Sequence, residues 1–122
     1  MTDEQNFKSF DLEERTQQFA LRCRDFMLIL PKTTPNFEYG KQLIRSSGST
    51  AANYIEANES LSRKDYFHRV RICRKEAKES RLWLNLSATS NTAALESIRQ
   101  ELIQETVELT KIFGSILEKA EL

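Results

Sequence analysis

The residue types that carry out metal or enzyme chemistry are sparse in this chain. Its single histidine, His68, follows Asp65 in the run DYFH, and an acid and a histidine at that spacing form half of a di-metal carboxylate site in a helical bundle. A complete site needs a second histidine, and Glu101, Glu105 and Glu108 lie along what we expect to be a solvated face. We therefore predict no metal site, and we expect His68 to be a surface residue.

Nucleophilic chemistry finds no better support. Cys23 and Cys73 are two isolated cysteines without CxxC spacing, and we expect both to be small buried residues in a reducing compartment. No base can be paired with either thiol from spacing, and the chain has no glycine-rich phosphate loop. The sequence predicts no enzyme and no cofactor.

The charged residues are balanced overall but unevenly distributed. The chain has 18 Lys and Arg and 18 Asp and Glu, whereas residues 61–90 hold eight basic against three acidic residues. A neutral chain argues against indiscriminate nucleic-acid binding, but a locally basic helix favours a specific form of it. We predict that the contacts to RNA or DNA come from Lys64, Arg71, Arg74, Lys75, Lys78 and Arg81. The alternative is a solvated basic face that pairs with acids of neighbouring helices.

These side chains must be positioned by helices, because apolar residues recur at helical spacing through most of the chain. We expect one domain over residues 1–122, with helices at about 10–31, 35–59, 63–89 and 92–120. Pro31 ends the first helix, Thr34 before Pro35 caps the second, and the run SRKD at 62–65 caps the third. Short connections imply antiparallel neighbours, so the predicted fold is an all-α, up-down-up-down four-helix bundle.

The residues expected in the core of the first and third helices follow spacings of four and three. In the first helix they are Leu12, Thr16, Phe19, Cys23, Phe26 and Leu30, and in the third they are Tyr66, Val70, Cys73, Ala77, Ser80, Leu84 and Ser87. In the second they are Phe37, Leu43, Ile44, Ser47, Ala51, Tyr54 and Ile55, and in the fourth Leu95, Ile98, Leu102, Thr106, Leu109, Phe113, Ile116 and Ala120.

The second helix contains an unusual run of small and polar residues. Gly48 costs about 1 kcal/mol relative to Ala in a helix interior, so something must offset it. The pairs Ser47 with Ala51 and Gly48 with Ala52 would let a neighbouring element approach closely. The alternative is a kink or short loop at SSGS, residues 46–49.

The third helix has a second, mixed flank beside its core residues, formed by Ile72, Glu76, Glu79, Trp83 and Leu86. We expect this flank to face the second helix or another subunit, with its glutamates paired to Arg45, Ser47, Thr50 or Asn53. A helix that is apolar on more than one flank usually buries both, so we predict a homo-oligomer with Ile72, Trp83 and Leu86 at its interface.

The run RSSGSTAANYIEANESLSRKDYF, residues 45–67, followed by KEAKESRLWL, residues 75–84, resembles the signature of a known family. These are small bacterial four-helix-bundle proteins encoded in intervening sequences of ribosomal RNA genes, and the accessory variability protein of diversity-generating retroelements looks like a relative. The matching positions are Arg45, Ser46, Ser47, Ser49, Ala52, Asn53, Glu56, Ala57, Ser62, Lys64, Asp65, Phe67, Lys75, Glu76, Ala77, Glu79, Trp83 and Leu84.

The resemblance implies a four-helix bundle that assembles as a ring, typically a pentamer, without catalytic activity. It adds Glu56 to the expected polar network of Arg45, Ser47, Asn53, Glu76 and Glu79. For the retroelement relatives it implies partnership with a reverse transcriptase and nucleic acid. The present chain departs from those relatives in being neutral rather than markedly basic.

Together these patterns predict a non-enzymatic oligomer that associates with RNA or with an RNA-processing or reverse-transcription partner. The alternative is a purely structural or protein-recruiting oligomer without a nucleic-acid role. The start, MTDEQNFKSF, is unlike a signal peptide, and the longest apolar run, FMLIL at 26–30, is too short to cross a bilayer. We therefore expect a cytoplasmic protein.

Overall fold

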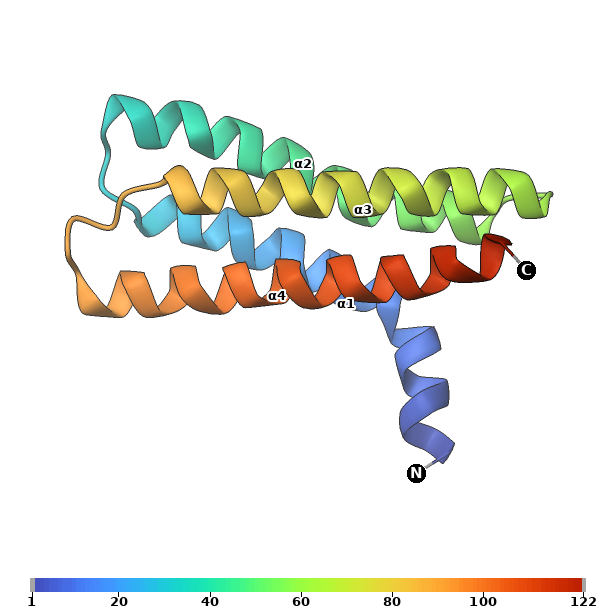
Figure 1. The fold of residues 1–122 in the computed structure, drawn as a ribbon. Coiled ribbons are helices and arrows are strands. Elements are labelled where there is room, and N and C mark those ends of the chain that lie inside the picture. The colour runs from blue at the N-terminus through green and yellow to red at the C-terminus, as the bar shows by residue number, and fades with distance from the viewer. Residues whose placement is uncertain (1, 122) are drawn as a thin grey trace.

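The computed structural model describes residues 2–121, and its side chains are described over residues 12–120. The chain forms four helices, α1 (Thr2–Ile29), α2 (Thr34–Asn58), α3 (Arg63–Leu86) and α4 (Ala93–Glu118), followed by the short 3-10 helix η1 (Lys119–Glu121). In Figure 1 the α1–α2 and α3–α4 links lie at one end of the bundle and the α2–α3 link lies at the other. The prediction of an all-α, up-down-up-down four-helix bundle is confirmed.

Some boundaries differ from those expected. The helix α1 begins at Thr2 rather than near residue 10, and its first turns extend away from the other helices (Figure 1). The helix α3 ends at Leu86 because Ser87 adopts an extended conformation. Ser90 and Asn91 have positive φ angles of 53° and 61°, and this left-handed turn separates α3 from α4. None of the described helices has a stretch long and apolar enough to pass through a membrane.

The residues expected in the core of α1 and α3 are buried as predicted. The six positions predicted for the first helix, which include Leu30 just after α1, are at most 4% exposed, and all those predicted for the third are buried except the half-buried Tyr66. In α4 the centre of the predicted set is fully buried and its ends are half-buried. Both cysteines are buried, and burial raises the pKa of each thiol to about 12, so neither is a reactive thiolate.

The prediction for the core face of α2 was partly wrong. Leu43, Ser47 and Tyr54 are buried, but Phe37, Ile44 and Ile55 are exposed. The face turned to the bundle is made largely of small and polar residues instead, namely Asn36, Gly40, Leu43, Ser46, Ser47, Thr50, Tyr54 and Ala57. The prediction was misled because three large apolar residues of α2, Phe37, Ile44 and Ile55, lie on the outer face of the helix.

The run of small residues in α2 is continuous helix, so the alternative of a kink or loop at SSGS is excluded. Its hydroxyls satisfy one another inside the bundle: Ser46 Oγ and Ser80 Oγ of α3 lie 2.7 Å apart, and Thr50 Oγ1 donates to the Ser46 carbonyl at 2.9 Å. Gly48 is not the point of close approach that we expected, because a Cβ there would meet no atom within 4 Å. That point is Gly40, where a Cβ would lie 2.5 Å from Cε of Met27.

Asn36 joins the two links at one end of the bundle. Its Nδ2 donates to the carbonyls of Pro31 at 3.0 Å and Ala88 at 2.9 Å, and its Oδ1 accepts from the Ala88 amide at 2.9 Å. The N-cap of α2 is Thr33, one residue before the predicted Thr34, and its side chain accepts from the Asn36 amide. The predicted cap of α3 is confirmed, since Ser62 Oγ accepts from the Asp65 amide.

Candidate functional site

The six predicted nucleic-acid-binding residues lie on α3 and leave their charges at the surface. Arg81 is half-buried, and the other five, Lys64, Arg71, Arg74, Lys75 and Lys78, are exposed. The alternative interpretation had them paired with acids of neighbouring helices. Over the side chains of residues 12–120, no salt bridge or side-chain hydrogen bond involves any of the six.

Four of these cations surround one open pocket of about 560 Å³. Its lining residues are Arg71, Arg74, Lys75, Lys78, Glu79, Leu82 and Leu117. Lys64 and Arg81 do not line it, so the structure brings together part of the predicted set. We call Arg71, Arg74, Lys75 and Lys78 the basic pocket. Cations that are clustered around one cavity suit an anion such as a phosphate.

A pair of carboxylates lies between the basic pocket and α2. Arg45 Nη1 donates to Glu76 Oε2 at 3.1 Å, and Arg45 Nη2 lies 3.6 Å from Glu79 Oε2. The Glu76 side chain is 9% exposed, whereas that of Glu79 is 38% exposed and also lines the pocket. Three members of the predicted polar network, Arg45, Glu76 and Glu79, are therefore in contact.

The two carboxyl groups differ in their affinity for a proton. Burial raises the pKa of Glu76, but hydrogen bonding with Glu79, Ser49 and Arg45 outweighs burial and brings this pKa below the usual 4.5. The hydrogen bond with Glu76, together with burial and the Glu76 charge, raises the pKa of Glu79 above 4.5. Oε1 of Glu76 is buried and accepts no hydrogen bond, and the hydroxyl of a protonated Glu79 is a suitable donor to it. As the pH falls, Glu79 is therefore the first of the two carboxylates to take up a proton.

The other expected members of the network do not contact the carboxylates directly, but Asn53 is linked to Glu76 through Ser49, because Asn53 Nδ2 donates to Ser49 Oγ at 3.0 Å and Ser49 hydrogen bonds with Glu76. Asn53 Oδ1 accepts from Arg69 Nη1 at 3.0 Å, a partner that we did not predict. Ser47 is buried on the side of α2 that faces α1, where its hydroxyl hydrogen bonds with Cys23. The side chain of Glu56 is exposed.

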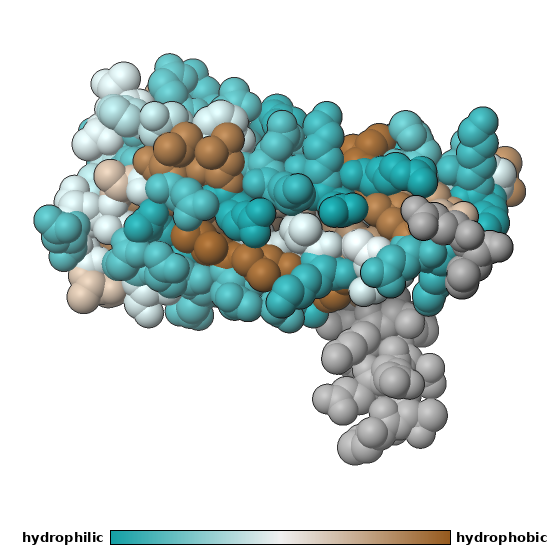
Figure 2. All heavy atoms as spheres, viewed as in Figure 1, coloured by the Kyte–Doolittle hydropathy of each residue, from teal (hydrophilic) through white to brown (hydrophobic). Residues whose placement is uncertain are grey.

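The residues expected at an oligomer interface occupy two environments. Ile72 and Trp83 are half-buried, and the Trp83 ring stacks on Tyr39 of α2 with centroids 6.0 Å apart. Leu86 is exposed. Leu82, one turn before it, is also exposed, and the sequence pattern did not indicate Leu82 as an interface residue. Figure 2 shows separate hydrophobic patches on an otherwise hydrophilic face, one of them over α2 and α3 near the α3–α4 link.

Over the side chains that the structure describes, the acidic and metal-ligating residues do not gather in a way that would hold a metal. His68 is exposed, as expected, and no group of three such side chains converges within the described residues. The prediction of a solvated face for the α4 glutamates holds for Glu101 but not for Glu105. Arg15 of α1 donates to both Glu105 carboxylate oxygens at 2.8 and 2.9 Å, which ties α1 to α4.

Comparisons with known proteins place the chain in a family. The sequence profile of the 23S rRNA-intervening sequence proteins matches residues 8–115. The chain belongs to this family. Among the solved structures, the chain resembles a protein of unknown function from the S23 ribosomal protein family of Bacteroides thetaiotaomicron. The two share 28% identity with a TM-score of 0.74, over 87% of this chain and 97% of the other.

The family assignment confirms the resemblance drawn from residues 45–84 and extends it over most of the bundle. No curated protein matches the chain. Neither the description of the family nor that of the solved structure names a catalytic activity, and the solved protein is itself described as having unknown function. The function of this chain has to be argued from its surfaces.

Proposed function

We propose that this intervening-sequence protein is a non-enzymatic homo-oligomer that associates with RNA through the basic pocket of α3. The observation that carries the proposal is the clustering of Arg71, Arg74, Lys75 and Lys78 around one cavity, without a salt bridge to any of them in the described structure. Cations that form no intramolecular salt bridge are available to phosphates, and binding would release counterions from the RNA.

Assembly strengthens this proposal, since each subunit of a ring repeats the pocket and weak contacts then act together. Two exposed leucines of α3, Leu82 in the pocket lining and Leu86 one turn later, supply apolar surface that a second subunit would cover. Five subunits are the expected number, and an RNA-processing or reverse-transcription protein is the expected additional partner.

The test is the binding of a labelled RNA hairpin to the wild type and to a variant with Arg71→Gln, Arg74→Gln and Lys78→Gln. We expect the variant to lose most of its affinity while its sedimentation coefficient stays unchanged. A matched control removes the same charge elsewhere, with Arg22→Gln, Arg24→Gln and Lys32→Gln, and should bind nearly as the wild type does. Equal losses in both variants would mean that only overall charge matters.

A second function, a protein-recruiting scaffold without a nucleic-acid role, is favoured by a separate observation. Large apolar residues are exposed along the outside of α2, at Phe37, Ile44 and Ile55. If wild-type protein shows no binding to RNA or DNA at low salt, this scaffold function replaces the first proposal.

A further inference from the structure

The basic pocket of α3 contains one acid among its lining residues. Glu79 borders the cavity together with the four cations and the apolar side chains of Leu82 and Leu117. Its side chain is 38% exposed, so a phosphate that enters the cavity meets this carboxylate as well as the cations. A carboxylate so close to the cations lowers the positive potential of the pocket and repels a phosphate. Glu79 therefore opposes the proposed function as long as it is charged.

The charge of Glu79 is only partly balanced by its neighbours. Its one salt bridge in the described structure is to Arg45 of α2 at 3.6 Å, and Arg45 lies closer to Glu76, at 3.1 Å. None of the four pocket cations lies within salt-bridge distance of Glu79. From α4 only the apolar Leu117 lines the pocket. The negative charge of Glu79 is thus surrounded by cations that do not pair with it.

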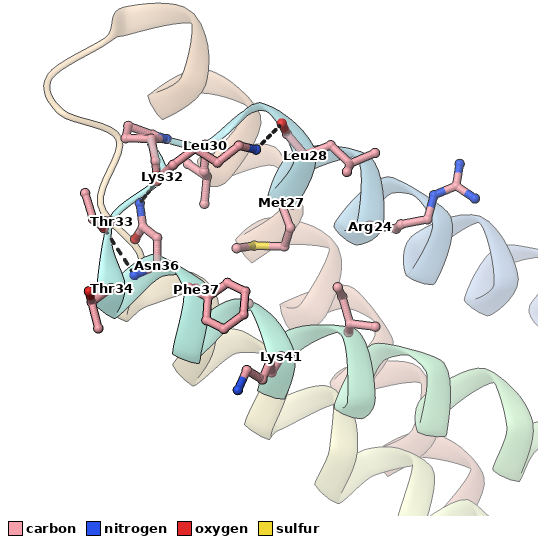
Figure 3. A pocket seen from close by; sticks show the side chains of 13 residues that line it. Arg24, Met27, Leu28, Leu30, Lys32, Thr33, Thr34, Asn36, Phe37 and Lys41 are labelled. Atoms are coloured by element: carbon pink, nitrogen blue, oxygen red, sulfur yellow. Dashed lines mark hydrogen bonds between the residues drawn. The ribbon is translucent and has the colours of Figure 1, made fainter.

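A second pocket, between α1 and α2, shows a different arrangement of charge (Figure 3). It measures about 470 Å³, and Arg24 and Lys41 are among its lining residues. Arg24 pairs with Asp25 at 2.9 Å and Lys41 with Glu38 at 3.3 Å, and neither acid lines the pocket. These two cations are thus neutralised from outside the cavity. In the basic pocket the cations are unpaired and the acid lies inside, so the charge of Glu79 sets how strongly the cavity attracts an anion.

Glu76 gives Glu79 a place to hold a proton. The hydrogen bond with Glu76, burial and the Glu76 charge raise the pKa of Glu79 above 4.5, and the charges of Arg45 and Lys75 only reduce this rise. Oε1 of Glu76 is buried and accepts no hydrogen bond. A protonated Glu79 can donate its hydroxyl to Glu76, whereas two charged carboxylates can only repel each other. The proton, taken from solvent, removes the negative charge of the pocket and leaves all four cations in place.

We infer that Glu79 couples RNA binding at the basic pocket to the uptake of a proton by the Glu76–Glu79 pair. This inference rests on the proposed function and adds a regulation of the same site. A bound phosphate repels the charged form of Glu79, so RNA favours the protonated form. The coupling is reciprocal, so protonation of Glu79 strengthens RNA binding by the same factor. RNA affinity therefore rises as the pH falls.

The experiment measures the affinity of the full-length protein for a labelled RNA hairpin between about pH 7.5 and about pH 5, at about 0.1 M salt. Histidine also gains charge in this range, and His68 is exposed on α3 one turn before Arg71, so every protein compared carries His68→Gln. At about pH 7.5, adding Glu79→Gln should tighten binding by about three- to tenfold, because it removes a unit charge next to the phosphate. This advantage should shrink toward acid pH, where Glu79 itself becomes protonated.

The matched control is Glu14→Gln. It removes the same charge from an exposed position on α1, a helix that packs mainly on α2 and α4 rather than on α3. It should change RNA affinity by less than about twofold and leave the pH dependence of binding unchanged. Equal effects of Glu14→Gln and Glu79→Gln would overturn the inference, because overall charge alone would then set the affinity.

Calorimetry measures the proton itself. Titration of RNA into the protein in two buffers that differ in their heat of ionisation gives the number of protons taken up on binding. A tenfold coupling corresponds to an uptake of at most about half a proton per pocket, at a pH near the raised pKa of Glu79. This uptake should be absent when Glu79→Gln is present, and equal uptake with and without the substitution would contradict the coupling.

The outcomes separate this inference from the proposed function. If the proteins with and without Glu79→Gln bind RNA equally at every pH, the inference fails and the proposed function stands. If neither protein binds RNA at any pH in the range, the proposed function fails and the inference falls with it. Melting curves recorded at each pH establish that both proteins are folded where their affinities are compared.

Discussion

At the scale of single residues, Asn36 has a larger structural role than its position in the sequence suggests. Its carboxamide satisfies the amide and carbonyl of Ala88 and the carbonyl of Pro31, and it is 3% exposed. Asn36→Ala leaves these groups without partners, so we expect a loss of roughly 1–3 kcal/mol in the free energy of unfolding. Urea denaturation measures it.

The control for this prediction is Gln104→Ala, which removes an exposed hydrogen bond from Gln104 to Glu108 on α4. It should change stability by no more than about 0.5 kcal/mol. Equal effects of the two substitutions would show that the Asn36 contacts do not hold the links together.

The Glu76–Glu79 pair predicts a dependence of stability on pH. Because the pKa of Glu79 is raised in the folded state, its stabilising effect is present at acid pH and is lost as the pH rises through that pKa. Glu79→Gln removes the repulsion between the two charges and offers a donor to Glu76 Oε1. We expect the variant to melt at a higher temperature than the wild type at neutral pH.

The advantage of Glu79→Gln should shrink as the pH falls through the raised pKa, since wild-type Glu79 then becomes protonated and can donate to Glu76 itself. Glu76 acts in the opposite sense, because its lowered pKa gives stability that is lost as the pH falls through it, but both proteins retain Glu76. A melting-temperature difference that is constant between neutral and acid pH would contradict this account.

At the scale of the elements, two glycines of α2 serve different purposes. Gly48→Ala should raise the free energy of unfolding by about 1 kcal/mol, because alanine favours the helix and meets nothing. Gly40→Ala should gain less, because its new Cβ would lie 2.5 Å from Cε of Met27, which must then move. Thermal denaturation of the two variants decides this, and a larger gain for Gly40→Ala would contradict the close packing of α1 on Gly40.

The helices also show how far the sequence alone leads. The core faces of α1 and α3 were predictable because their apolar and small residues recur at one regular spacing of four and three. In α2 two faces compete, and the larger residues Phe37, Ile44 and Ile55 occupy the outer one. A sequence pattern indicates that a face is apolar, but it does not indicate which of two such faces the same chain covers.

The candidate site was predictable to a similar degree. Helical spacing was enough to gather Arg71, Arg74, Lys75 and Lys78, since all four lie on one helix. Contacts between distant segments were not accessible in this way, because they depend on the register of one helix against another. The bond of Asn53 to Arg69 is an example, and the two links that Asn36 joins lie still further apart in sequence.

At the scale of the whole molecule, the exposed leucines of α3 lead to a prediction about assembly. Analytical ultracentrifugation should show a homo-oligomer, with five copies of the 14.2 kDa chain giving about 71 kDa. Leu82→Gln combined with Leu86→Gln should shift the distribution to smaller species, because the apolar surface that a neighbouring subunit covers is removed. A wild-type monomer at micromolar concentration would contradict the assembly.

The central claim is that phosphates bind the basic pocket, and the salt dependence of RNA affinity tests it most directly. The logarithm of the association constant should fall linearly with the logarithm of salt concentration for the wild type. Removing Arg71, Arg74 and Lys78 together should make this slope shallower by about two for single-stranded RNA, at roughly 0.7 for each phosphate that the protein no longer neutralises. An unchanged slope in that variant, or wild-type affinity that is insensitive to salt, would contradict the claim.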